Sequence, residues 1–492
     1  MSSPATKQQP SIAIVGAGVS GICLAVNLKR AGIHDFVILE KSNEVGGTWN
    51  ENTYPGAACD VPSHLYSLSF EPNPNWTRKY PRQGEILEYF RGVARKYDIY
   101  SHIRFGVELD EAAFDEASGQ WKLRTSTGEE TMVKVLASGC GQLNRPAMPA
   151  IPGLESFKGA SFHSARWDHS FDLNGKRVAV VGNGPSAIQF IPEVAKVAGE
   201  LTVYHRTPNY VVPRLDRPYT AFERWLFAKV PGAGRAYRWA LYWTLEKNRI
   251  AFTRGTWFNK LFRQIADQHM TTQIADEKLR AILTPDYDLG CKRILISDDW
   301  LPALTRPNVE VIGAEIDHIT ENTVVNKDGT VREVDAIIFG TGFESTKFLT
   351  PMKVVGAGGK PLTQAWQGGA EAHLGVSVAG FPNFFMMYGP NTNLGHNSII
   401  FMIECQVSYI LGCINKIRNN RLSYLDVKPE AMERYNIGVQ EAIRESVWAA
   451  GCRSWYKTED GKVTNNWSGF TAEYWWRTRE PDFADYRLVS GS

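Results

Sequence analysis

Two copies of one glycine pattern constrain the fold of this chain more than any other feature. Residues 16–21 (GAGVSG) follow the apolar run 11–15 (SIAIV), and residues 182–187 (GNGPSA) follow the run 177–181 (RVAVV). Such an apolar run predicts a buried parallel strand, and the glycines let the chain turn tightly into a helix whose free N–H groups face a phosphate. We therefore expect two strand–turn–helix units, each binding one dinucleotide.

The three fixed positions of the pattern have different roles. The first permits the turn, the second lets the backbone approach a pyrophosphate, and the third lets the helix pack closely on the strand. Alanine takes the third position in the second copy, which the pattern tolerates. The expected contacts are Gly16, Gly18 and Gly21 in the first copy and Gly182, Gly184, Ser186 and Ala187 in the second.

The residue expected after the second strand of each unit differs in charge between the copies. Glu40 lies 24 residues after Gly16 (40 − 16), and Arg206 lies 24 residues after Gly182 (206 − 182), so we expect them at the same structural position. A carboxylate accepts hydrogen bonds from ribose hydroxyls, whereas an arginine binds a 2′-phosphate bidentately. We therefore assign FAD to the first site and NADPH to the second.

The two units predict an α/β fold with two Rossmann-like dinucleotide-binding domains, the second inserted in the first. Apolar strands that end in glycine turns, at residues 135–139 (VLASG) and 335–342 (DAIIFGTG), are typical of a chain passing from one such domain to the other. The expected FAD-binding domain comprises residues 1–149 and 335–492, and the NADP-binding domain comprises residues 150–334 with a helical insertion at about 215–285.

Composition narrows the class of protein further. The net charge of +2 gives no overall attraction to nucleic acid. We find no run of about 18 uncharged apolar residues that would span a membrane, and residues 1–10 lack the features of a signal peptide, so we expect a cytoplasmic protein. The seven cysteines are scattered without a CxxC pair, which predicts reduced thiols and no metal site.

Two longer motifs resemble those of a known family. Residues 157–168 (FKGASFHSARWD) match the FxGxxxHxxxW(P/D) pattern of type I Baeyer–Villiger monooxygenases, which are class B flavin-dependent monooxygenases. Residues 46–60 (GGTWNENTYPGAACD) match a second pattern of that family, and together with the glycine motifs the resemblance covers nearly the whole chain. It implies an NADPH-dependent enzyme that forms a C4a-peroxyflavin from O2, converts a ketone to an ester or lactone, and also oxidises sulfides.

The resemblance also implies roles for individual residues. Arg293 resembles the family's catalytic arginine, Asp60 the aspartate that holds it, and Lys292 the lysine on the NADPH 2′-phosphate. An arginine stays charged at any relevant pH and stabilises negative charge that develops during the reaction. Trp455 resembles the tryptophan on the nicotinamide side, and His163 resembles a linker histidine without a catalytic role. The other expected cofactor contacts are Thr48, Trp49, Tyr66, Gln142, Arg206 and Thr207, in addition to Asp60 and Arg293 themselves.

Three positions depart from the family's pattern. Ala58 stands where many relatives have arginine, and Gly340 stands where alanine is common. Cys140 makes the glycine turn that leads to Gln142 longer than usual.

Residues 222–263 are rich in aromatic side chains and hold nine bases but only two acids. The spacing of Trp239 and Trp243 predicts amphipathic helices. We interpret the segment as packing helices with a basic rim for the cofactor site, which predicts no membrane contact. A hydrophobic substrate entrance and contact with an anionic membrane surface are the alternatives.

Rival functions share some of these features. A flavin-containing N- or S-oxygenase without ketone activity uses the same cofactors, but the Trp-Asp ending of residues 157–168 favours the Baeyer–Villiger type. A flavin disulfide reductase needs a CxxxxC pair after the first glycine motif, where only Cys59 lies. A non-catalytic redox sensor would not consume NADPH. The sequence specifies neither the ketone nor the oligomeric state.

Overall fold

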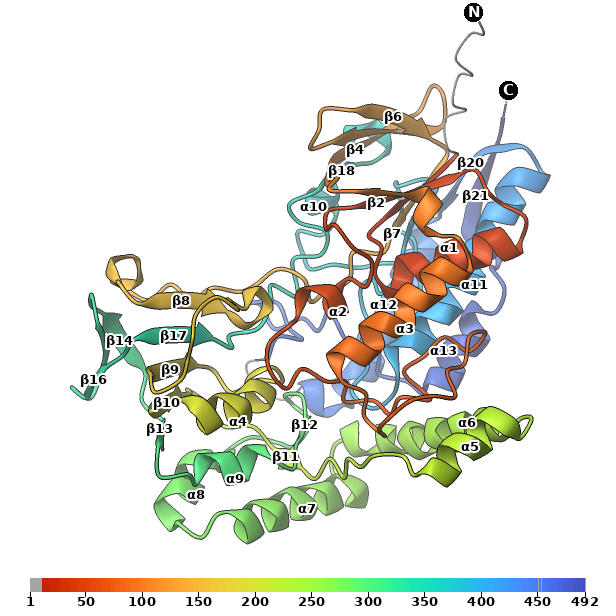
Figure 1. Cartoon of the computed structure of the whole chain (residues 1–492). Coiled ribbons are helices and arrows are strands. Elements are labelled where there is room, and N and C mark those ends of the chain that lie inside the picture. Colours follow the sequence, from red (N-terminus) through yellow and green to blue (C-terminus); the bar gives the residue numbers. More distant parts are fainter. Residues whose placement is uncertain (1–10, 450, 453, 492) are drawn as a thin grey trace, which may run out of the picture.

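Two five-stranded parallel sheets form the centre of the computed structural model, which describes residues 11–449, 451–452 and 454–491 (Figure 1). The first sheet has the order β19-β7-β1-β2-β3, so strands from both ends of the chain meet in it. Every residue of β1 and β2 is buried, as their apolar runs predict. The strands are β19 (Phe384–Met386), β7 (Val135–Ser138), β1 (Ile12–Val15), β2 (Phe36–Glu40) and β3 (Ile103–Phe105).

The second sheet has the order β13-β10-β9-β17-β8 and contains one strand that we expected elsewhere. We expected the chain to return to the first domain at residue 335, but β17 lies between β9 and β8 in the second sheet. All four residues of β17 are buried, as in a central strand of a parallel sheet. The second domain therefore extends through β17, and the boundary expected at residue 335 is wrong by one strand. The strands are β13 (Val309–Ile312), β10 (Glu200–Tyr204), β9 (Arg177–Val181), β17 (Ala336–Phe339) and β8 (Ala160–His163).

Both glycine turns have the same backbone arrangement. The Gly16 amide donates to the Leu39 carbonyl, and the Gly182 amide donates to the Tyr204 carbonyl, each at 2.8 Å. Gly16 and Gly182 have φ of 96° and 111°, a region that favours glycine. The turns lead into α1 (Val19–Arg30) and α4 (Ala187–Val197), so the two predicted units are present.

These hydrogen bonds also correct the expected equivalence of Glu40 and Arg206. Because Leu39 and Tyr204 are equivalent, the counterpart of Glu40 is His205, and Arg206 lies one position further on. The second unit reaches its second strand one residue sooner than the first, so equal spacing in the sequence does not mean equal position in the fold.

A helical segment lies between β11 (Val211–Val212) and β12 (Leu295–Ile296), which pair with each other. The amphipathic helix predicted around Trp239 and Trp243 is α6. The aromatic side chains of the segment are not all packed, since Trp225, Trp239, Trp243 and Trp257 are 53%, 50%, 59% and 69% exposed. The packing interpretation is therefore wrong for these four tryptophans. The helices are α5 (Ala221–Lys229), α6 (Ala233–Glu246), α7 (Trp257–Gln273) and α8 (Glu277–Leu283).

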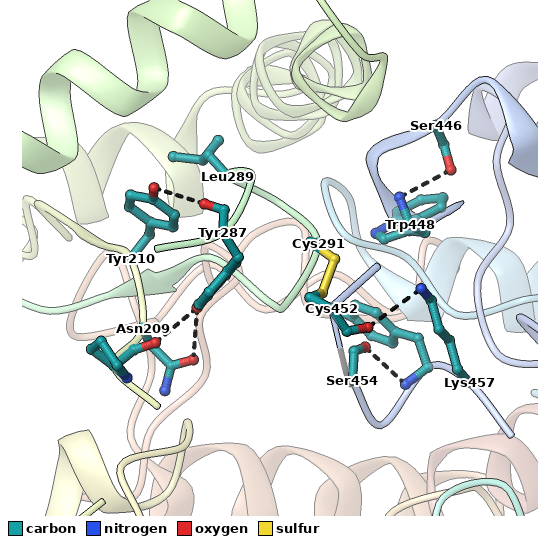
Figure 2. The surroundings of a disulfide bond; sticks show 12 residues. Asn209, Tyr210, Tyr287, Leu289, Cys291, Ser446, Trp448, Cys452, Ser454 and Lys457 are labelled. Carbon is teal, nitrogen blue, oxygen red and sulfur yellow. Dashed lines mark hydrogen bonds between the residues drawn. A yellow bond between two sulfur atoms is a disulfide. The ribbon is translucent and has the colours of Figure 1, made fainter. Parts of the chain in front are cut away.

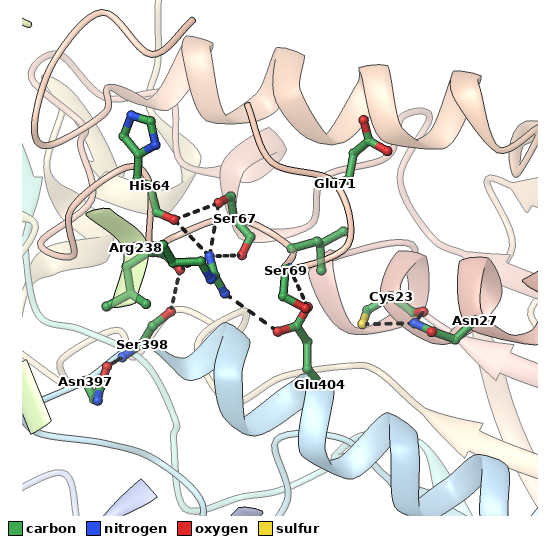
Figure 3. A network of polar contacts seen from close by, with 12 residues as sticks. Cys23, Asn27, His64, Ser67, Ser69, Glu71, Arg238, Asn397, Ser398 and Glu404 are labelled. Carbon is green, nitrogen blue, oxygen red and sulfur yellow. Dashed lines mark hydrogen bonds and ion pairs between the residues drawn. The ribbon is translucent and has the colours of Figure 1, made fainter. Parts of the chain in front are cut away.

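A buried arginine fixes this helical segment to the first domain (Figure 3). Arg238 of α6 donates to the carbonyls of His64 and Ser67 at 2.9 and 2.8 Å. It also pairs with Glu404 of α11 (Ile399–Asn419) at 3.7 Å. Burial raises the pKa of Glu404 although the charge of Arg238 opposes the shift. These contacts connect α6 to the first domain. Loss of Arg238 would leave the Glu404 carboxylate without its partner in a largely buried place, which is costly.

The long apolar helix α11 is the one described helix that could cross a membrane by length and composition. In the fold it instead packs against α1, α13 (Thr471–Thr478) and β20 (Leu422–Val427). Eleven of its residues are buried, and Gln406 inside it donates to the Tyr474 hydroxyl at 3.0 Å. The helix therefore forms part of the protein core.

Smaller sheets and helices complete the structure. A four-stranded sheet has the order β18-β4-β5-β6, and a three-stranded sheet has the order β14-β15-β16. The strands are β4 (Leu109–Asp115), β5 (Gln120–Thr125), β6 (Glu130–Val133), β14 (Ile316–Ile319), β15 (Thr323–Asn326), β16 (Val331–Glu333), β18 (Lys353–Val355) and β21 (Tyr486–Ser490), and the helices are α2 (Thr48–Glu51), α3 (Gln83–Lys96), α9 (Trp300–Leu304), α10 (Leu362–Ala365) and α12 (Pro429–Arg444).

Two of the seven cysteines form a disulfide, contrary to the expectation of reduced thiols. Cys291 and Cys452 are 161 residues apart in the sequence, and their Cα atoms are 6.4 Å apart. No spacing rule predicts a pair at such separation, because only the fold brings these two loops together. The other five cysteines are free.

Candidate active site

A cavity of about 1840 Å³ lies between the two glycine turns. Pockets for drug-sized ligands have volumes of about 300–1,000 Å³, so this cavity has room for two dinucleotides. Of the expected site residues, only Gly21 and Ala187 do not line it, because both pack a helix against its turn. The expected residues that line the cavity are Gly16, Gly18, Glu40, Thr48, Trp49, Asp60, Tyr66, Gln142, Gly182, Gly184, Ser186, Arg206, Thr207, Lys292, Arg293 and Trp455.

At the first turn, a buried carboxylate lies where the ribose site was predicted. Glu40 ends β2 and accepts hydrogen bonds from the amides of Ala17 and Ser42 at 2.6 and 2.8 Å. These bonds hold the carboxylate beside the turn, where it lines the cavity. A Cβ atom on Gly47 would lie 3.0 Å from the Cα of Gly18, so this part of the wall admits little but glycine.

Gln142 provides a test of whether FAD fits this end of the cavity. Its side chain is buried, and its Nε2 donates to the carbonyl of Tyr388 at 3.2 Å. Its Oε1 is also buried but has no hydrogen-bond partner among the described residues. A buried acceptor without a donor is costly, so the atom fits a ligand that donates a hydrogen bond there. The longer turn at Cys140 therefore leaves Gln142 able to contact the cofactor.

Beside Trp49, the wall is aromatic and fixed. The indole N–H of Trp49, in the short helix α2, donates to the hydroxyl of Tyr66 at 3.0 Å. Their rings meet edge to face with centroids 5.7 Å apart. This pair gives a rigid surface next to the glycine turn.

At the second turn, the cations Lys292 and Arg206 lie close enough for their charges to interact. Burial lowers the pKa of Lys292, and the nearby charge of Arg206 lowers it further. The ammonium of Lys292 lies 4.9 Å from the centroid of the Tyr287 ring, which orients it. Two like charges that converge on one cavity wall form a site for an anion, and a 2′-phosphate has the required charge.

Between the two turns lies an ion pair of Arg293 and Asp60. Arg293 precedes β12, and its Nη2 donates to the Asp60 carboxylate. Burial alone would raise the pKa of Asp60, but the charge and hydrogen bond of Arg293 outweigh it and lower the pKa below 3.8. Both groups are therefore charged at neutral pH, and both line the cavity.

Three further side chains in or beside the cavity were not predicted. Arg214 donates to the Cys59 carbonyl at 2.8 Å, and its charge also lowers the pKa of Asp60. Tyr388 lines the cavity, and its hydroxyl donates to Asn393 Oδ1 at 2.7 Å. Gln189, in the first turn of α4, receives a hydrogen bond from the Tyr54 hydroxyl at 3.0 Å and thereby joins the two nucleotide units. The position of Gln189, directly after the second glycine motif, was the one available signal in the sequence.

His163 lies outside the cavity wall, at the end of the edge strand β8. Its Nδ1 accepts a hydrogen bond from the Ala165 amide at 3.1 Å, and its ring meets Phe343 edge to face. Burial lowers its pKa. These contacts fit a structural residue at the junction of the two sheets.

Trp455 lines the cavity from the C-terminal part of the chain. Its carbonyl accepts a hydrogen bond from Ser345 Oγ at 2.9 Å, and its ring contacts that of Tyr456 with centroids 4.4 Å apart. The expected site residues thus come from segments at 16–66, 142, 182–207, 292–293 and 455, which the fold brings to one cavity.

Comparison with known proteins agrees with this geometry. The model of the flavin-binding monooxygenase-like family matches residues 9–354. The chain is 44% identical to a Baeyer–Villiger monooxygenase of Streptomyces coelicolor over 481 residues, which cover 97% of this chain and 92% of that protein.

Solved structures agree with the same assignment. Cyclohexanone monooxygenase in a closed form is 27% identical with a TM-score of 0.88, over 99% of this chain and 100% of that one. An oxidised steroid monooxygenase bound to NADP is 28% identical with a TM-score of 0.87, over 98% and 100% of the two chains. The chain therefore belongs to the flavin-binding monooxygenase-like family and resembles Baeyer–Villiger monooxygenases of that family in both sequence and fold.

Proposed function

We propose that this protein is an NADPH-dependent flavin monooxygenase that inserts one atom of O2 beside the carbonyl of a ketone, giving an ester or lactone. The observation that carries the proposal is the Arg293–Asp60 ion pair in the cavity between two dinucleotide-binding turns. Oxidation of sulfides is a second reaction of the same site.

When bound, FAD reduced by NADPH supplies the activation of O2, and the protein supplies position and charge. Glu40 holds the ribose of FAD at the first turn, and Lys292 with Arg206 holds the 2′-phosphate of NADP at the second. Arg293 supplies a permanent positive charge where negative charge develops on the reacting oxygen atoms. Asp60 orients the guanidinium of Arg293 and balances its charge.

The chain must also keep water from the site, because water and protons divert reduced oxygen to H2O2. Trp455 and Tyr388 both line the cavity with aromatic rings. Retention of NADP by Lys292 and Arg206 serves the same purpose, since the bound cofactor occupies space that water would otherwise fill.

A conversion screen tests the proposed reaction. The protein is incubated with NADPH recycling, a panel of ketones and thioanisole, and products are identified by mass spectrometry. We expect esters or lactones from some ketones and the sulfoxide from thioanisole. Sulfoxide formation without an ester from any ketone would assign the chain to the heteroatom oxygenases instead.

Substitution of Arg293 by alanine tests its role separately from cofactor binding. We expect Arg293→Ala to retain flavin reduction by NADPH and to lose ester formation by about 10²–10³-fold, the usual effect of removing one electrostatic group. Stopped-flow absorbance measures reduction, and gas chromatography measures the ester. Normal ester formation by this variant would refute the role of Arg293.

A further inference from the structure

The disulfide joins two loops that both carry cavity-lining residues (Figure 2). Cys291 directly precedes Lys292 and Arg293, and Cys452 lies three residues before Trp455. We propose that Cys291 and Cys452 form an oxidation site at which a disulfide locks the Trp455 segment over the cofactor cavity.

Noncovalent contacts also join the two segments, since burial raises the pKa of Tyr456, the residue after Trp455, and the nearby charge of Arg293 opposes that shift. The Cys291 amide donates to the Asp288 carbonyl at 3.0 Å, within its own loop. The Cys452 carbonyl accepts a hydrogen bond from Lys457 Nζ at 3.4 Å, also within its own loop. The disulfide is the only covalent crosslink in the described part of the chain. Its loss would therefore remove the covalent tie between the Trp455 segment and the loop of Lys292 and Arg293.

The different exposure of the two cysteines indicates which thiol reacts first with an oxidant. Cys452 is partly exposed, whereas Cys291 is fully buried. Hydrogen peroxide, which a flavin monooxygenase releases when oxygen is not transferred to substrate, is the oxidant. The Cys452 thiolate attacks the peroxide, its O–O bond breaks, and a sulfenic acid and hydroxide form. Cys291 then displaces the sulfenic oxygen as water, so two thiols and one H2O2 give one disulfide and two waters.

The free cysteines do not compete for this oxidation. Cys23, Cys59, Cys405 and Cys413 are buried, and Cys140 is partly buried. Burial raises the pKa of each of these thiols, so little reactive thiolate is present. Oxidation is therefore directed to the Cys291–Cys452 pair.

The effect of the disulfide on NADP retention and on H2O2 release rests on the proposed function. A locked Trp455 segment retains NADP and excludes water, whereas the dithiol form releases NADP faster and loses more oxygen as H2O2. Peroxide from unproductive turnover would thus close the site that produced it.

Peptide mapping of the FAD-loaded protein tests the pairing without any need for turnover. We expect a peptide that joins Cys291 to Cys452 after treatment with H2O2, and two alkylated thiols after reduction with TCEP. Alkylation of both thiols after peroxide treatment, with no joined peptide, would overturn the proposal.

Stopped-flow measurement of NADP⁺ release tests the lock. We expect release about 5-fold faster or more after reduction, the lower end of usual coupling between two sites. Cys452→Ser should release NADP⁺ at that faster rate with or without TCEP, and Cys413→Ala, in α11 away from the cavity, should respond to TCEP as the wild type does. Equal release rates in the oxidised and reduced wild type would refute the lock. A joined peptide and slowed release in a protein that makes no ester would uphold the lock and refute the ketone reaction instead.

A separate feature is the outward face of α5 and α6, two helices that lie side by side at one edge of the structure (Figure 1). Among the described residues, this face carries exposed aromatic side chains and bases. Ala236, Trp239, Ala240 and Trp243 follow one another at helical spacing on the exposed side of α6. The two acids of the segment are both engaged within the protein. Glu223 pairs with Arg217 at 2.6 Å. Glu246 is buried, and its carboxylate accepts a hydrogen bond from the Thr471 hydroxyl at 2.7 Å.

The positive charge of the outward face of α5 and α6 favours an anionic partner over a second copy of the chain. A symmetric dimer would place the same positive surface on both sides of the interface, with no acids to balance it. Exposed tryptophan beside arginine and lysine instead suits the boundary of an anionic bilayer, where the rings enter the headgroup region and the bases meet lipid charges. We infer that α5 and α6 dock on an anionic membrane surface, contrary to the expectation of no membrane contact.

Sedimentation with lipid vesicles tests this surface. We expect the protein to sediment with phosphatidylcholine vesicles that contain phosphatidylglycerol at low salt, and to stay in solution with phosphatidylcholine alone. Trp239→Ser/Trp243→Ser should lose this binding, and Ile437→Ser, at an exposed position of α12, should keep it. No binding by the wild type, or equal binding by the double variant, would refute the inference. A concentration-dependent dimer in light scattering that the double variant abolishes would assign the face to a second copy.

Discussion

The two glycine turns have the same backbone hydrogen bond but build their nucleotide sites in different ways. At the first turn, Glu40 lies at the end of the adjacent strand, and amides of Ala17 and Ser42 hold it. At the second turn, the corresponding position holds His205, and the cations near the turn are Arg206 and Lys292, far apart in the sequence. The charged group of the first site thus comes from the strand directly after the turn helix, whereas the cations of the second site come together only when distant parts of the domain fold.

The packing of the following helix differs as well. A Cβ atom on Gly21 would overlap the carbonyl oxygen of Gly16, so α1 approaches its turn as closely as a glycine allows. Ala187 takes the same position in α4, where its Cβ would lie 3.0 Å from a Cβ on Gly340. The glycine at 340 therefore leaves space for Ala187.

Exchanging the residues at this packing position should have the largest effect. Gly21→Ala forces a methyl group into backbone, and overpacking of this kind costs about 1–3 kcal/mol or more out of a typical total of about 5–15 kcal/mol. We expect little soluble protein and no bound FAD, measured by yield and by flavin absorbance. Ala187→Gly is the control and should retain FAD and most activity. FAD-loaded Gly21→Ala in normal yield would show that the two turns pack alike.

Removing a cation from the second site should have the next largest effect. A hydrogen bond to a charged group contributes about 1.5–3 kcal/mol, so Lys292→Ala should raise the KM for NADPH by about 10–100-fold. Arg206→Ala should have a smaller effect in the same direction, because Arg206 is more exposed. Steady-state kinetics with NADH provide the control, since NADH has no 2′-phosphate. An equal loss with NADH and NADPH would contradict the assignment of the second site.

Neutralising Asp60, in the ion pair between the two turns, should have the smallest of these effects, a change in thermal stability. The pKa of Asp60 is lowered in the folded state, so its stabilising contribution is present above its unfolded value of 3.8 and is lost as pH falls through the lower folded value. We expect Asp60→Asn to lower Tm by a few degrees at neutral pH, and the difference from wild type to shrink below about pH 4. Thermal unfolding across this pH range, followed by intrinsic fluorescence, measures it. A difference that grows toward low pH would contradict the sign.

Local sequence patterns and the family resemblance predicted much of the fold, and most of the site residues predicted in this way line the cavity. Buried β1 and β9 with their glycine turns followed from apolar runs and glycine spacing, which depend on neighbouring residues alone. Features that depend on distant contacts were missed. The membership of β17 in the second sheet, the support of Asp60 by Arg214, and the disulfide all join segments far apart in the sequence. Glu40 and Arg206 are not equivalent because the second unit has one residue fewer between its glycine turn and its second strand, and the sequence does not show where that strand ends.

The central claim is that one atom of O2 enters the product beside a ketone carbonyl, with NADPH as the electron donor. Turnover of a ketone under ¹⁸O₂ in unlabelled water, followed by mass spectrometry of the ester, tests it directly. We expect one ¹⁸O atom in each ester molecule and its loss in Arg293→Ala. An ester without the label, or NADPH consumption that yields only H2O2 with every ketone, would contradict the claim.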